Sequence, residues 1–482
     1  MKPTAIVIGS GPNGLAGAIT LAQAGFDVEV REASEQPGGG ARTGELTLPG
    51  FFHDLGSAVH PLAVGSPFFS TLPLSDHGLK WIWPSAQLAH PLDDGTAVTL
   101  ESDVGQTASQ LGQDGKAYGK LFAPLVADWP KLAGDVLGPL RLPAHPFLLG
   151  QFGMRAILSC TAVSDALFRE PRSRALFAGI CAHSTLKMEA PLSAAFGMIL
   201  GAAGHAVGWP IPQGGAQGIS NALISYLNSL GGRVVTKAPV RALREIRGYD
   251  LTLCDVTPRQ FLTLAEGELR LPFRQLLEQY EYGPGVYKVD WALSEPIPWR
   301  AKECSRAITV HLGASLEEIA ASERVCNQGQ PPERPFVLLA QPTLFDSSRA
   351  PARKHIAWSY CHVPNGWTGS AAYAIESQIE RFAPGFRECI LATSARGPAD
   401  KQCWNSNLVG GDINGGVPNL KQFVLRPTWR RYSTPLKGIY LCSSSTPPGG
   451  AVHGMCGYWA ARWALNYFEK KWKTAKFPFA MP

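Results

Sequence analysis

The sequence predicts an α/β protein, and three observations lead to this fold class. A β-branched strand near the N-terminus runs through a glycine-rich turn into a helix-like segment. A second strand follows and ends at an acidic residue. Near the C-terminus, another short strand leads through a second glycine-rich segment into a helix. Strands that alternate with helices are typical of parallel βαβ units, and 482 residues are enough for two joined domains.

The first strand is expected at residues 4–8, T-A-I-V-I. The turn after it is made by Gly9, Ser10, Gly11, Pro12, Asn13 and Gly14. This is the G-x-G-x-x-G pattern between a strand and a helix, the setting in which it binds a dinucleotide. Gly9 permits the tight turn, Gly11 lets the backbone approach a pyrophosphate, and Gly14 lets helix and strand pack closely, with the helix N-terminus facing the anion. The segment therefore predicts a Rossmann-like nucleotide-binding domain.

Two further segments bear on which dinucleotide is bound. The second strand, residues 27–31, is followed by Glu32 and Ala33, and an acid about 20 residues after the glycines can accept both hydroxyls of an adenosine ribose. The loop P-G-G-G-A-R-T that comes next contributes Gly39, Gly40 and Arg42. Its backbone and guanidinium form a second contact point for a long cofactor. Together the two segments favour FAD over NAD.

Charge and cysteine content exclude several other classes of function. The net charge of +6 is spread along the chain with no basic run interleaved with aromatics, so no nucleic-acid partner is expected. The ten cysteines include no C-x-x-C pair, which predicts reduced thiols, no metal site and a cytoplasmic setting. The chain enters a strand at Ala5 without a secretory signal pattern before it.

Two segments raise the question of membrane contact. Residues 190–209 carry almost no charge and are long enough to span a bilayer, but they are rich in Gly and Ala, so a buried segment near a pocket is expected instead. The C-terminal cluster of Lys470, Lys471, Lys473 and Lys476 is either a solvated helix end or a peripheral contact with an anionic membrane surface.

By these features the chain resembles the phytoene-desaturase-like and amine-oxidase-like flavoproteins, in particular the phytoene-dehydrogenase-related branch. The matching segments are V-I-G-S-G-P-N-G-L, E-A-S-E-Q-P-G-G with Arg42, P-I-P-Q-G-G-A-Q-G-I-S, L-G-G-R-V-V-T-K-A-P-V, and G-I-Y-L-C-S-S-S-T-P-P-G-G-A-V-H-G near the C-terminus. The resemblance covers essentially the whole chain. It implies a Rossmann-like FAD-binding domain of the glutathione reductase/amine oxidase type, interleaved with an α+β substrate domain.

The resemblance also implies how the two domains share the chain. The FAD-binding domain is expected from residues 1–70, 205–265 and 425–475, the substrate-binding domain from 71–204 and 266–424, and a C-terminal tail from 476–482. The segment 241–257 is shorter than the antiparallel connection that the family usually carries there.

Cofactor contacts near the C-terminus follow from the same resemblance. A strand at residues 438–442 leads to a helix that begins near His453, and the helix N-terminus is expected to point at the flavin pyrimidine ring, where reduced flavin carries negative charge. Val452 is expected to donate its amide to the flavin. The other implied FAD contacts are Ser443, Gly450 and Ala451, with Val240 on the adenine side.

The resemblance also bears on how the flavin is attached. Non-covalent FAD is implied, because residues 407–416 lack the cysteine through which some amine oxidases attach their flavin. In that region Gly410, Gly411 and Asp412 are expected to face the flavin or the substrate.

Three residues are candidates for catalysis. Lys288 lies in V-Y-K-V-D-W, which resembles the amine-oxidase strand whose lysine holds a water near flavin N5. The alternative is a surface lysine on a half-exposed strand. His60 and His453 are candidates for acid–base roles, as is His183, with structural hydrogen bonding as the alternative for each.

With FAD bound, the expected chemistry is hydride removal from a C–H bond. The resemblance favours desaturation or dehydrogenation of a largely apolar small molecule. A flavin amine oxidase is the alternative, and a non-redox flavin-dependent isomerase or an FAD-binding structural protein is a further one. No second G-x-G-x-x-G stands between a strand and a helix, so electrons are expected to leave to oxygen, a quinone or another acceptor. The oligomeric state is left open.

Overall fold

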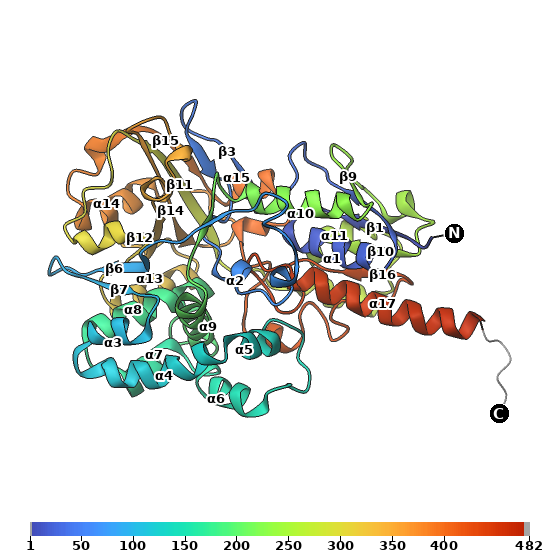
Figure 1. The fold of residues 1–482 in the computed structure, drawn as a ribbon, viewed down its shortest axis with the longest axis horizontal. Helices are drawn as coiled ribbons and strands as arrows, with labels where there is room; N and C mark the ends of the chain where they lie inside the picture. The colour runs from blue at the N-terminus through green and yellow to red at the C-terminus, as the bar shows by residue number, and fades with distance from the viewer. Residues whose placement is uncertain (1, 477–482) are drawn as a thin grey trace.

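The structure is a computed structural model that describes residues 2–476, with side chains described through Phe468 (Figure 1). The predicted basic cluster, Lys470 to Lys476, falls where only the backbone is described, and residues 477–482 of the predicted tail lie outside the described part.

A five-stranded parallel sheet forms one half of the molecule (Figure 1, right). Its strands, in spatial order, are β16 (Ile439–Leu441), β10 (Leu251–Cys254), β1 (Thr4–Ile8), β2 (Asp27–Arg31) and β9 (Arg233–Val235). The two N-terminal strands form at the predicted residues, and the predicted strand at 438–442 is one residue shorter at each end. Strands from three distant stretches of chain thus build one sheet.

Two helices cross closely on one face of this sheet. Helix α1 (Pro12–Gln23) follows the glycine-rich turn, and α17 (Met455–Lys476) packs against it. A Cβ at Gly457 of α17 would lie 1.7 Å from the Asn13 carbonyl oxygen, so only glycine fits at the crossing. Helix α10 (Gln217–Ser229) also packs against α1. The connection from β9 to β10 holds only a short 3-10 turn at Leu243–Ile246, in line with the short segment noted in the sequence.

A seven-stranded mixed sheet forms the second half (Figure 1, upper left). Its strands, in spatial order, are β15 (Ile390–Arg396), β11 (Gly285–Leu293), β14 (His355–Val363), β13 (Val337–Ala340), β12 (Ala307–Leu312), β6 (Ala86–Pro91) and β7 (Ala97–Leu100). The strand expected around residues 280–295 is β11. Its residues alternate between an apolar core and a second, polar face, and both faces are buried.

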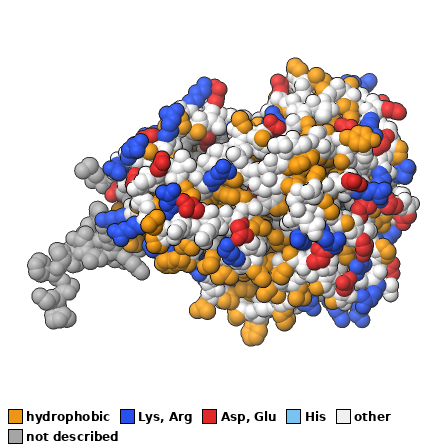
Figure 2. All heavy atoms as spheres, turned by 180° about the vertical axis from the view of Figure 1, so that it is seen from behind, with side chains coloured by type: hydrophobic (Ala, Val, Ile, Leu, Met, Phe, Trp, Pro, Cys, Tyr) orange, Lys and Arg blue, Asp and Glu red, His pale blue; other side chains and the backbone are white. Residues whose placement is uncertain are grey.

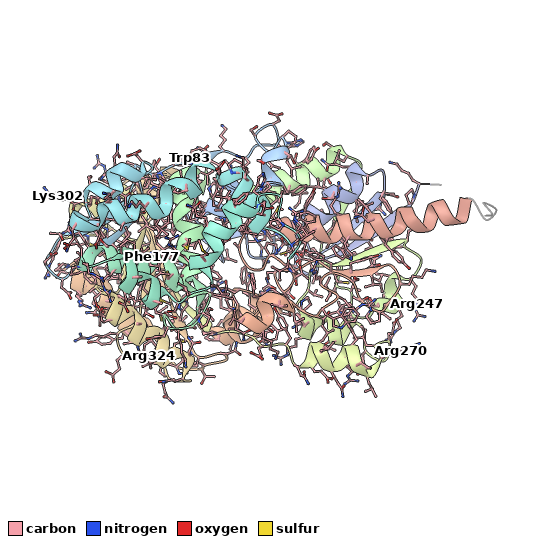
Figure 3. The ribbon with its side chains drawn as sticks, turned by 90° about the horizontal axis from the view of Figure 1, so that it is seen from below. Trp83, Phe177, Arg247, Arg270, Lys302 and Arg324 are labelled. Atoms are coloured by element: carbon pink, nitrogen blue, oxygen red, sulfur yellow. The ribbon has the colours of Figure 1, made fainter. Side chains whose placement is uncertain are left out.

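A helical lobe lies beneath the mixed sheet in Figure 1. It contains α3 (Val104–Ser109), α4 (Gly115–Ala127), α5 (Trp129–Val136), α6 (Pro146–Ala156), α7 (Cys160–Leu167), α8 (Pro171–Cys181) and α9 (Ser193–Ala206). Phe177 of α8 is buried inside this lobe (Figure 3). Within residues 2–476 no single helix is long and apolar enough to cross a membrane, although α6 and α7, bent by 98°, meet that test as a pair.

Shorter elements complete the fold. They are β3 (Thr43–Glu45), β4 (Phe52–Asp54), α2 (Pro61–Val64), β5 (Trp81–Ile82), β8 (Ile211–Pro212), α11 (Pro258–Leu264), α12 (Leu271–Glu278), α13 (Leu316–Asn327), α14 (Ala372–Phe382), α15 (Pro398–Trp404) and α16 (Leu420–Val424). Several of them carry residues of the site described next.

Candidate functional site

A cavity of about 1420 Å³ lies between the parallel sheet, the mixed sheet and the helical lobe. Its lining includes nearly every residue singled out in the sequence: Gly9, Gly11, Pro12, Asn13, Glu32, Ala33, Gly39, Gly40, Arg42, His60, Val240, Lys288, Ser443, Gly450, Ala451, Val452 and His453. Gly14 is not in the lining. It lies inside α1, where a Cβ would come within 2.2 Å of the Gly9 carbonyl oxygen, so its part is to let helix and loop pack closely.

The glycine-rich turn is shaped by close backbone contacts. Gly9 has φ +96° and donates its N–H to the Arg31 carbonyl at 2.8 Å, a conformation that side chains rarely adopt. A Cβ at Gly11 would lie 2.6 Å from the carboxylate of Asp255. The turn therefore leaves the N-terminus of α1 open toward the cavity, as an anion site requires.

Glu32 lies at the end of β2 and faces the turn. Its Oε2 accepts hydrogen bonds from the backbone N–H and the hydroxyl of Ser10, at 2.9 and 2.6 Å, and its Oε1 accepts the Ser34 N–H at 2.9 Å. These three bonds fix the carboxylate in place. Of about four lone-pair directions on a carboxylate, roughly one is left for a ligand hydroxyl.

Asp255 is a site residue that the sequence reasoning missed. It follows β10 directly, lines the cavity, and accepts the Gly14 N–H at 3.0 Å. Burial, and then the negative charge of Glu32, raise the pKa of this carboxyl to about 7. The available signal was its place at the carboxyl end of a short apolar strand, where ligands of parallel sheets bind.

Arg42 is held by its own loop and by a distant aromatic ring. Its Nε donates to the Gly39 carbonyl at 2.9 Å and an Nη to the Gln36 carbonyl at 3.3 Å, while the guanidinium lies 4.5 Å above the ring of Trp404 in α15. Burial lowers the pKa of Arg42. Trp404 also lines the cavity and gave no signal in the sequence.

The C-terminal glycine-rich segment forms another wall. Gly449 and Ala451 have φ +123° and +114°, and a Cβ at Gly450 would meet the backbone of Asn414 at 3.0 Å. Helix α17 begins at Met455, two residues after the predicted His453. The Ser443 hydroxyl donates to the Val256 carbonyl at 2.8 Å, so its hydrogen is not free for a phosphate oxygen.

A buried arginine, Arg426, hydrogen-bonds to the backbone near this segment. Arg426 donates through Nη2 to the carbonyls of Asn414 and Ser444, at 2.8 and 2.9 Å, and it lines the cavity. Through Arg426 these contacts join the segment of Asn414, 12 residues before it in the chain, to that of Ser444, 18 residues after it. Arg426 was not predicted from the sequence.

Lys288 is buried on β11, which excludes the alternative of a surface lysine. Its ammonium group is paired with Asp290, two residues along the same face, and lies 5.2 Å from the ring centre of Trp358. His53 approaches Asp290 at 3.5 Å, and burial lowers the pKa of this histidine to about 4. Burial also lowers the pKa of Lys288, although the charge of Asp290 opposes this effect.

A second buried lysine, Lys401 of α15, lines the same cavity. Its Nζ donates to the Leu55 carbonyl at 3.3 Å, and within the described residues it has no carboxylate within ion-pair distance. Burial, followed by the positive charge of Lys288, lowers the pKa of Lys401 well below its ordinary value. The cavity therefore holds one paired and one unpaired buried amine.

His60 and His453 are both buried in the lining, and burial lowers each pKa to about 4. Both are neutral at pH 7. The Nδ1 atom of His453 accepts the Met455 N–H at 3.0 Å, so its Nε2 carries the hydrogen. His183 also lines the cavity, and its Nε2 lies 3.1 Å from Nε2 of His311.

The remaining walls are mostly apolar. They include Phe152 of α6, Ala195, Phe196, Ile199 and Leu200 of α9, and Trp209, Leu338, Trp358 and Tyr360. The segment expected to be buried beside a pocket is thus the α9 wall.

The expectation for Gly410, Gly411 and Asp412 was wrong, because none of the three lines the cavity. The lining instead includes Ile413 to Gly415, and Asp412 accepts the N–H groups of Gly283, Asn414 and Gly416. Among residues 2–468, no three His, Cys, Asp or Glu side chains are placed to hold a metal ion.

Comparison with known proteins agrees with this fold. The NAD(P)-binding Rossmann-like domain family matches residues 7–69. "Pyridine nucleotide-disulfide oxidoreductase domain-containing protein 2" of Rattus norvegicus is 25% identical over 96% of this chain and 93% of its own length. "4,4'-diapolycopen-4-al dehydrogenase" of Metabacillus indicus is 30% identical over 25% of this chain and 26% of its own. Wild-type putrescine oxidase bound to putrescine has a similar structure, with a TM-score of 0.63, 18% identity, and coverage of 97% of this chain and 99% of the oxidase.

The expected fold class is therefore confirmed: a mixed α/β protein with a Rossmann-like domain and amine-oxidase-type structural neighbours. The expected class of enzyme, an oxidoreductase, is confirmed as well, because the homologues and the structural neighbours are oxidoreductases.

Proposed function

We propose that this protein binds FAD non-covalently and removes a hydride from a largely apolar organic substrate, as in a desaturation or dehydrogenation. The observation that carries the proposal is one cavity whose lining combines two chemically different sets of residues. One set is the glycine-rich turn with Glu32 and Arg42, and the other is the apolar side chains of α6 and α9. The cavity's volume exceeds that of ordinary small-ligand pockets, as a dinucleotide plus substrate requires.

The residues present fit FAD. Six lining residues each have a buried polar atom without a hydrogen-bond partner in the described residues: Oδ1 of Asn13, Oγ1 of Thr309, Nε2 of His60 and His453, and Nε1 of Trp358 and Trp404. Buried polar groups are rarely left unpaired, so these atoms support a polar ligand. The N-terminus of α1 suits the pyrophosphate, Glu32 a ribose hydroxyl, and Val240 the adenine side.

The C-terminal segment suits the flavin ring. We propose that Gly450, Ala451 and the Val452 amide lie along its pyrimidine edge, with Ser443 at the preceding turn. The positive φ of Ala451 supports this arrangement, because strained backbone at such a position is common at ligand sites. Gly39, Gly40, Ala33 and Arg42 complete the proposed contacts, together with the turn residues Gly9, Gly11, Pro12 and Asn13, while Gly14 assists by letting α1 pack closely on the turn.

FAD, when bound, supplies the acceptor for the hydride. The chain's own residues orient the substrate and manage protons. Apolar walls from α6 and α9 exclude water, and Lys288 is held by Asp290. Lys401 is the better proton acceptor of the two, because within the described residues its amine has no carboxylate partner and burial lowers its pKa well below the ordinary value. His60 and His453, neutral at pH 7, suit hydrogen bonding more than acid catalysis.

The division of the chain, the electron acceptor and the location belong to the same proposal. The FAD-binding domain comprises residues 1–70, 205–265 and 425–475, and the remaining segments up to residue 424 form the substrate domain. Electrons leave to oxygen, a quinone or another acceptor. The protein acts in the cytoplasm, on a small molecule and not on nucleic acid, with peripheral membrane contact.

Replacing Glu32 with Ala tests the proposal directly. Because Glu32 would hold a ribose hydroxyl with a charged acceptor, the Glu32→Ala variant should bind FAD about 10- to 100-fold more weakly. Flavin content after purification and FAD titration by fluorescence quenching measure this. Glu35→Ala is the matched control, since Glu35 is an exposed carboxylate three residues away that, among the described side chains, forms an ion pair only with exposed Lys237. Unchanged flavin content in Glu32→Ala would overturn the cofactor assignment.

A flavin amine oxidase is the second candidate, and the buried Lys288 on its strand favours it. Anaerobic mixing with candidate substrates separates the two. Bleaching of the flavin by apolar alkenes or ring compounds supports the dehydrogenase, whereas bleaching and peroxide release with simple amines alone supports the oxidase. A bound flavin that no substrate bleaches would contradict both redox functions.

A further inference from the structure

An apolar patch stands on the surface of the helical lobe and the neighbouring α16 segment. We call it the apolar rim and define it by Leu142, Phe147, Met154, Phe423, Val424 and Trp429, each of which is exposed. Leu142 is 95% exposed and Phe147 94% exposed. Apolar side chains gather along the lower edge of the molecule in Figure 2, where Figure 1 places α6. Large apolar side chains that are exposed in such numbers on one edge of a molecule mark an interaction surface.

The apolar rim borders the mouth of the cavity. Phe423 and Val424 belong to the cavity lining and are also exposed, as are Leu140 and Ile157 next to α6. The cavity therefore reaches the surface between α6 and α16. Whatever covers the apolar rim also covers the route by which an apolar molecule enters.

The two chain segments that form the rim carry no acidic residue, and Glu281, which comes from outside them, is paired with Lys421 of α16. Residues 136–164 contain no Asp or Glu but include Arg141 and Arg155, and residues 413–438 contain none but include Arg430 and Arg431. Within the described residues none of these four arginines has a carboxylate at ion-pair distance. Asp135, just before the first segment, has its side chain almost fully buried and bonded to the backbone of residues 144 and 145.

Aromatic residues of α17 contact both segments of the rim, residues 136–164 and 413–438. The guanidinium of Arg141 lies 4.5 Å above the ring of Trp459, and that of Arg431 lies 5.9 Å from the ring of Trp463. The patch is thus continuous across α17, which runs past the lobe in the view from below (Figure 3).

These observations decide between two occupants. A symmetric dimer through this face would set the same patch against itself, so that unpaired arginines would face unpaired arginines. Anionic lipid headgroups would neutralise the arginines, and the interface of a bilayer would accept the leucine, phenylalanine and tryptophan side chains.

We propose that this face docks on an anionic membrane surface, with Leu142 and Phe147 inserted among the lipids and the cavity mouth held against the bilayer. An apolar substrate then enters from the membrane without crossing water. The docking itself does not depend on FAD. Its use for substrate entry rests on the proposed apolar substrate.

The test uses the full chain and vesicles of phosphatidylcholine with or without 30% phosphatidylglycerol, with binding measured by co-sedimentation. The wild type should bind the anionic vesicles, more weakly as salt rises. The double variant Leu142→Ser/Phe147→Ser should bind at least tenfold more weakly. The control Leu271→Ser/Tyr373→Ser changes two side chains that are 70% and 77% exposed elsewhere, and it should bind as the wild type does.

Other results would overturn the proposal. The first is failure of the wild type to bind anionic vesicles, and the second is an equal loss of binding in the control variant. The third is unchanged vesicle binding in Leu142→Ser/Phe147→Ser together with loss of vesicle binding when Lys470, Lys471, Lys473 and Lys476 are replaced by Gln. A wild-type dimer that Leu142→Ser/Phe147→Ser converts to monomers in light scattering would assign the face to a second copy. Glu32→Ala should still bind vesicles, so failure of the cofactor proposal and of the docking proposal are distinguishable.

Discussion

At the scale of single residues, Asp255 is a titratable carboxyl in direct contact with the nucleotide-binding turn. Its carboxyl accepts the Gly14 N–H, and the charged group that acts on it is Glu32, a second acid. The neighbouring thiols Cys442 and Cys456 are neutral, because burial raises their pKa values. Glu32 and the proposed pyrophosphate are both negatively charged and lie near Asp255. Their repulsion makes the ionised form of Asp255 unfavourable once the anion is bound.

This arrangement predicts that FAD binding depends on pH. In the free protein Asp255 ionises around pH 7, and a bound pyrophosphate raises its pKa further. Below pH 7 the carboxyl is protonated in both states and does not affect affinity. Above pH 7 binding must take up a proton, so affinity should fall by up to about tenfold per pH unit. FAD titrations between pH 6 and 8.5 measure this, and in Asp255→Asn this dependence should disappear; the same slope in the variant would refute the assignment.

At the scale of elements, the crossing of α1 and α17 holds the two ends of the chain together. Gly17 and Gly457 face each other there, and a Cβ at Gly457 would collide with the Asn13 backbone. The crossing positions both the glycine-rich turn and the segment before α17 on the cavity. A shift of α17 therefore disturbs two walls of the site at once.

Replacing Gly457 with Ala should destabilise the protein by about 3 kcal/mol, since the added methyl group overpacks a backbone contact that cannot yield easily. Denaturant unfolding followed by circular dichroism measures the change. Gly119→Ala serves as the control, because a Cβ at this helical glycine of α4 meets nothing within 4 Å. The control should be neutral or more stable by about 0.5–1 kcal/mol. Equal stability of the Gly457 variant and the wild type would contradict the close crossing.

At the scale of the whole molecule, burial decides which thiols can react. All ten cysteines are free, and Cys403 alone among them is exposed. A thiol reagent should therefore modify one thiol per native chain within minutes and ten after unfolding in guanidinium. Cys403→Ser should remove the fast reaction and leave nine thiols in the unfolded chain. Two or more fast thiols in the native protein would show that the buried set is exposed.

Local features were predictable because their constraints act within a few residues. The turn from Gly9 to Gly14 needs glycine where a side chain would collide with nearby backbone. Strands β1 and β2 were predictable from the β-branched residues that they contain. Lys288 was selected because its segment resembles the lysine-bearing strand of the amine oxidases, and it lies on β11. The strand's alternation did not reveal that both faces are buried, because a polar face looks the same in sequence whether water or Asp290 and His53 lie against it.

The amino-acid order was sufficient for the Rossmann-like turn, the acid after the second strand and the class of enzyme, since each depends on short-range spacing. The pairing of Arg42 with Trp404, the approach of Asp255 to Gly14 and the unpaired state of Lys401 depend on residues that are separated by 241 or more positions in the first two cases. Such contacts exist only after the sheets and the helical lobe have packed around one cavity. The apolar rim is of the same kind, because its two segments are distant in the chain and meet only at the cavity mouth.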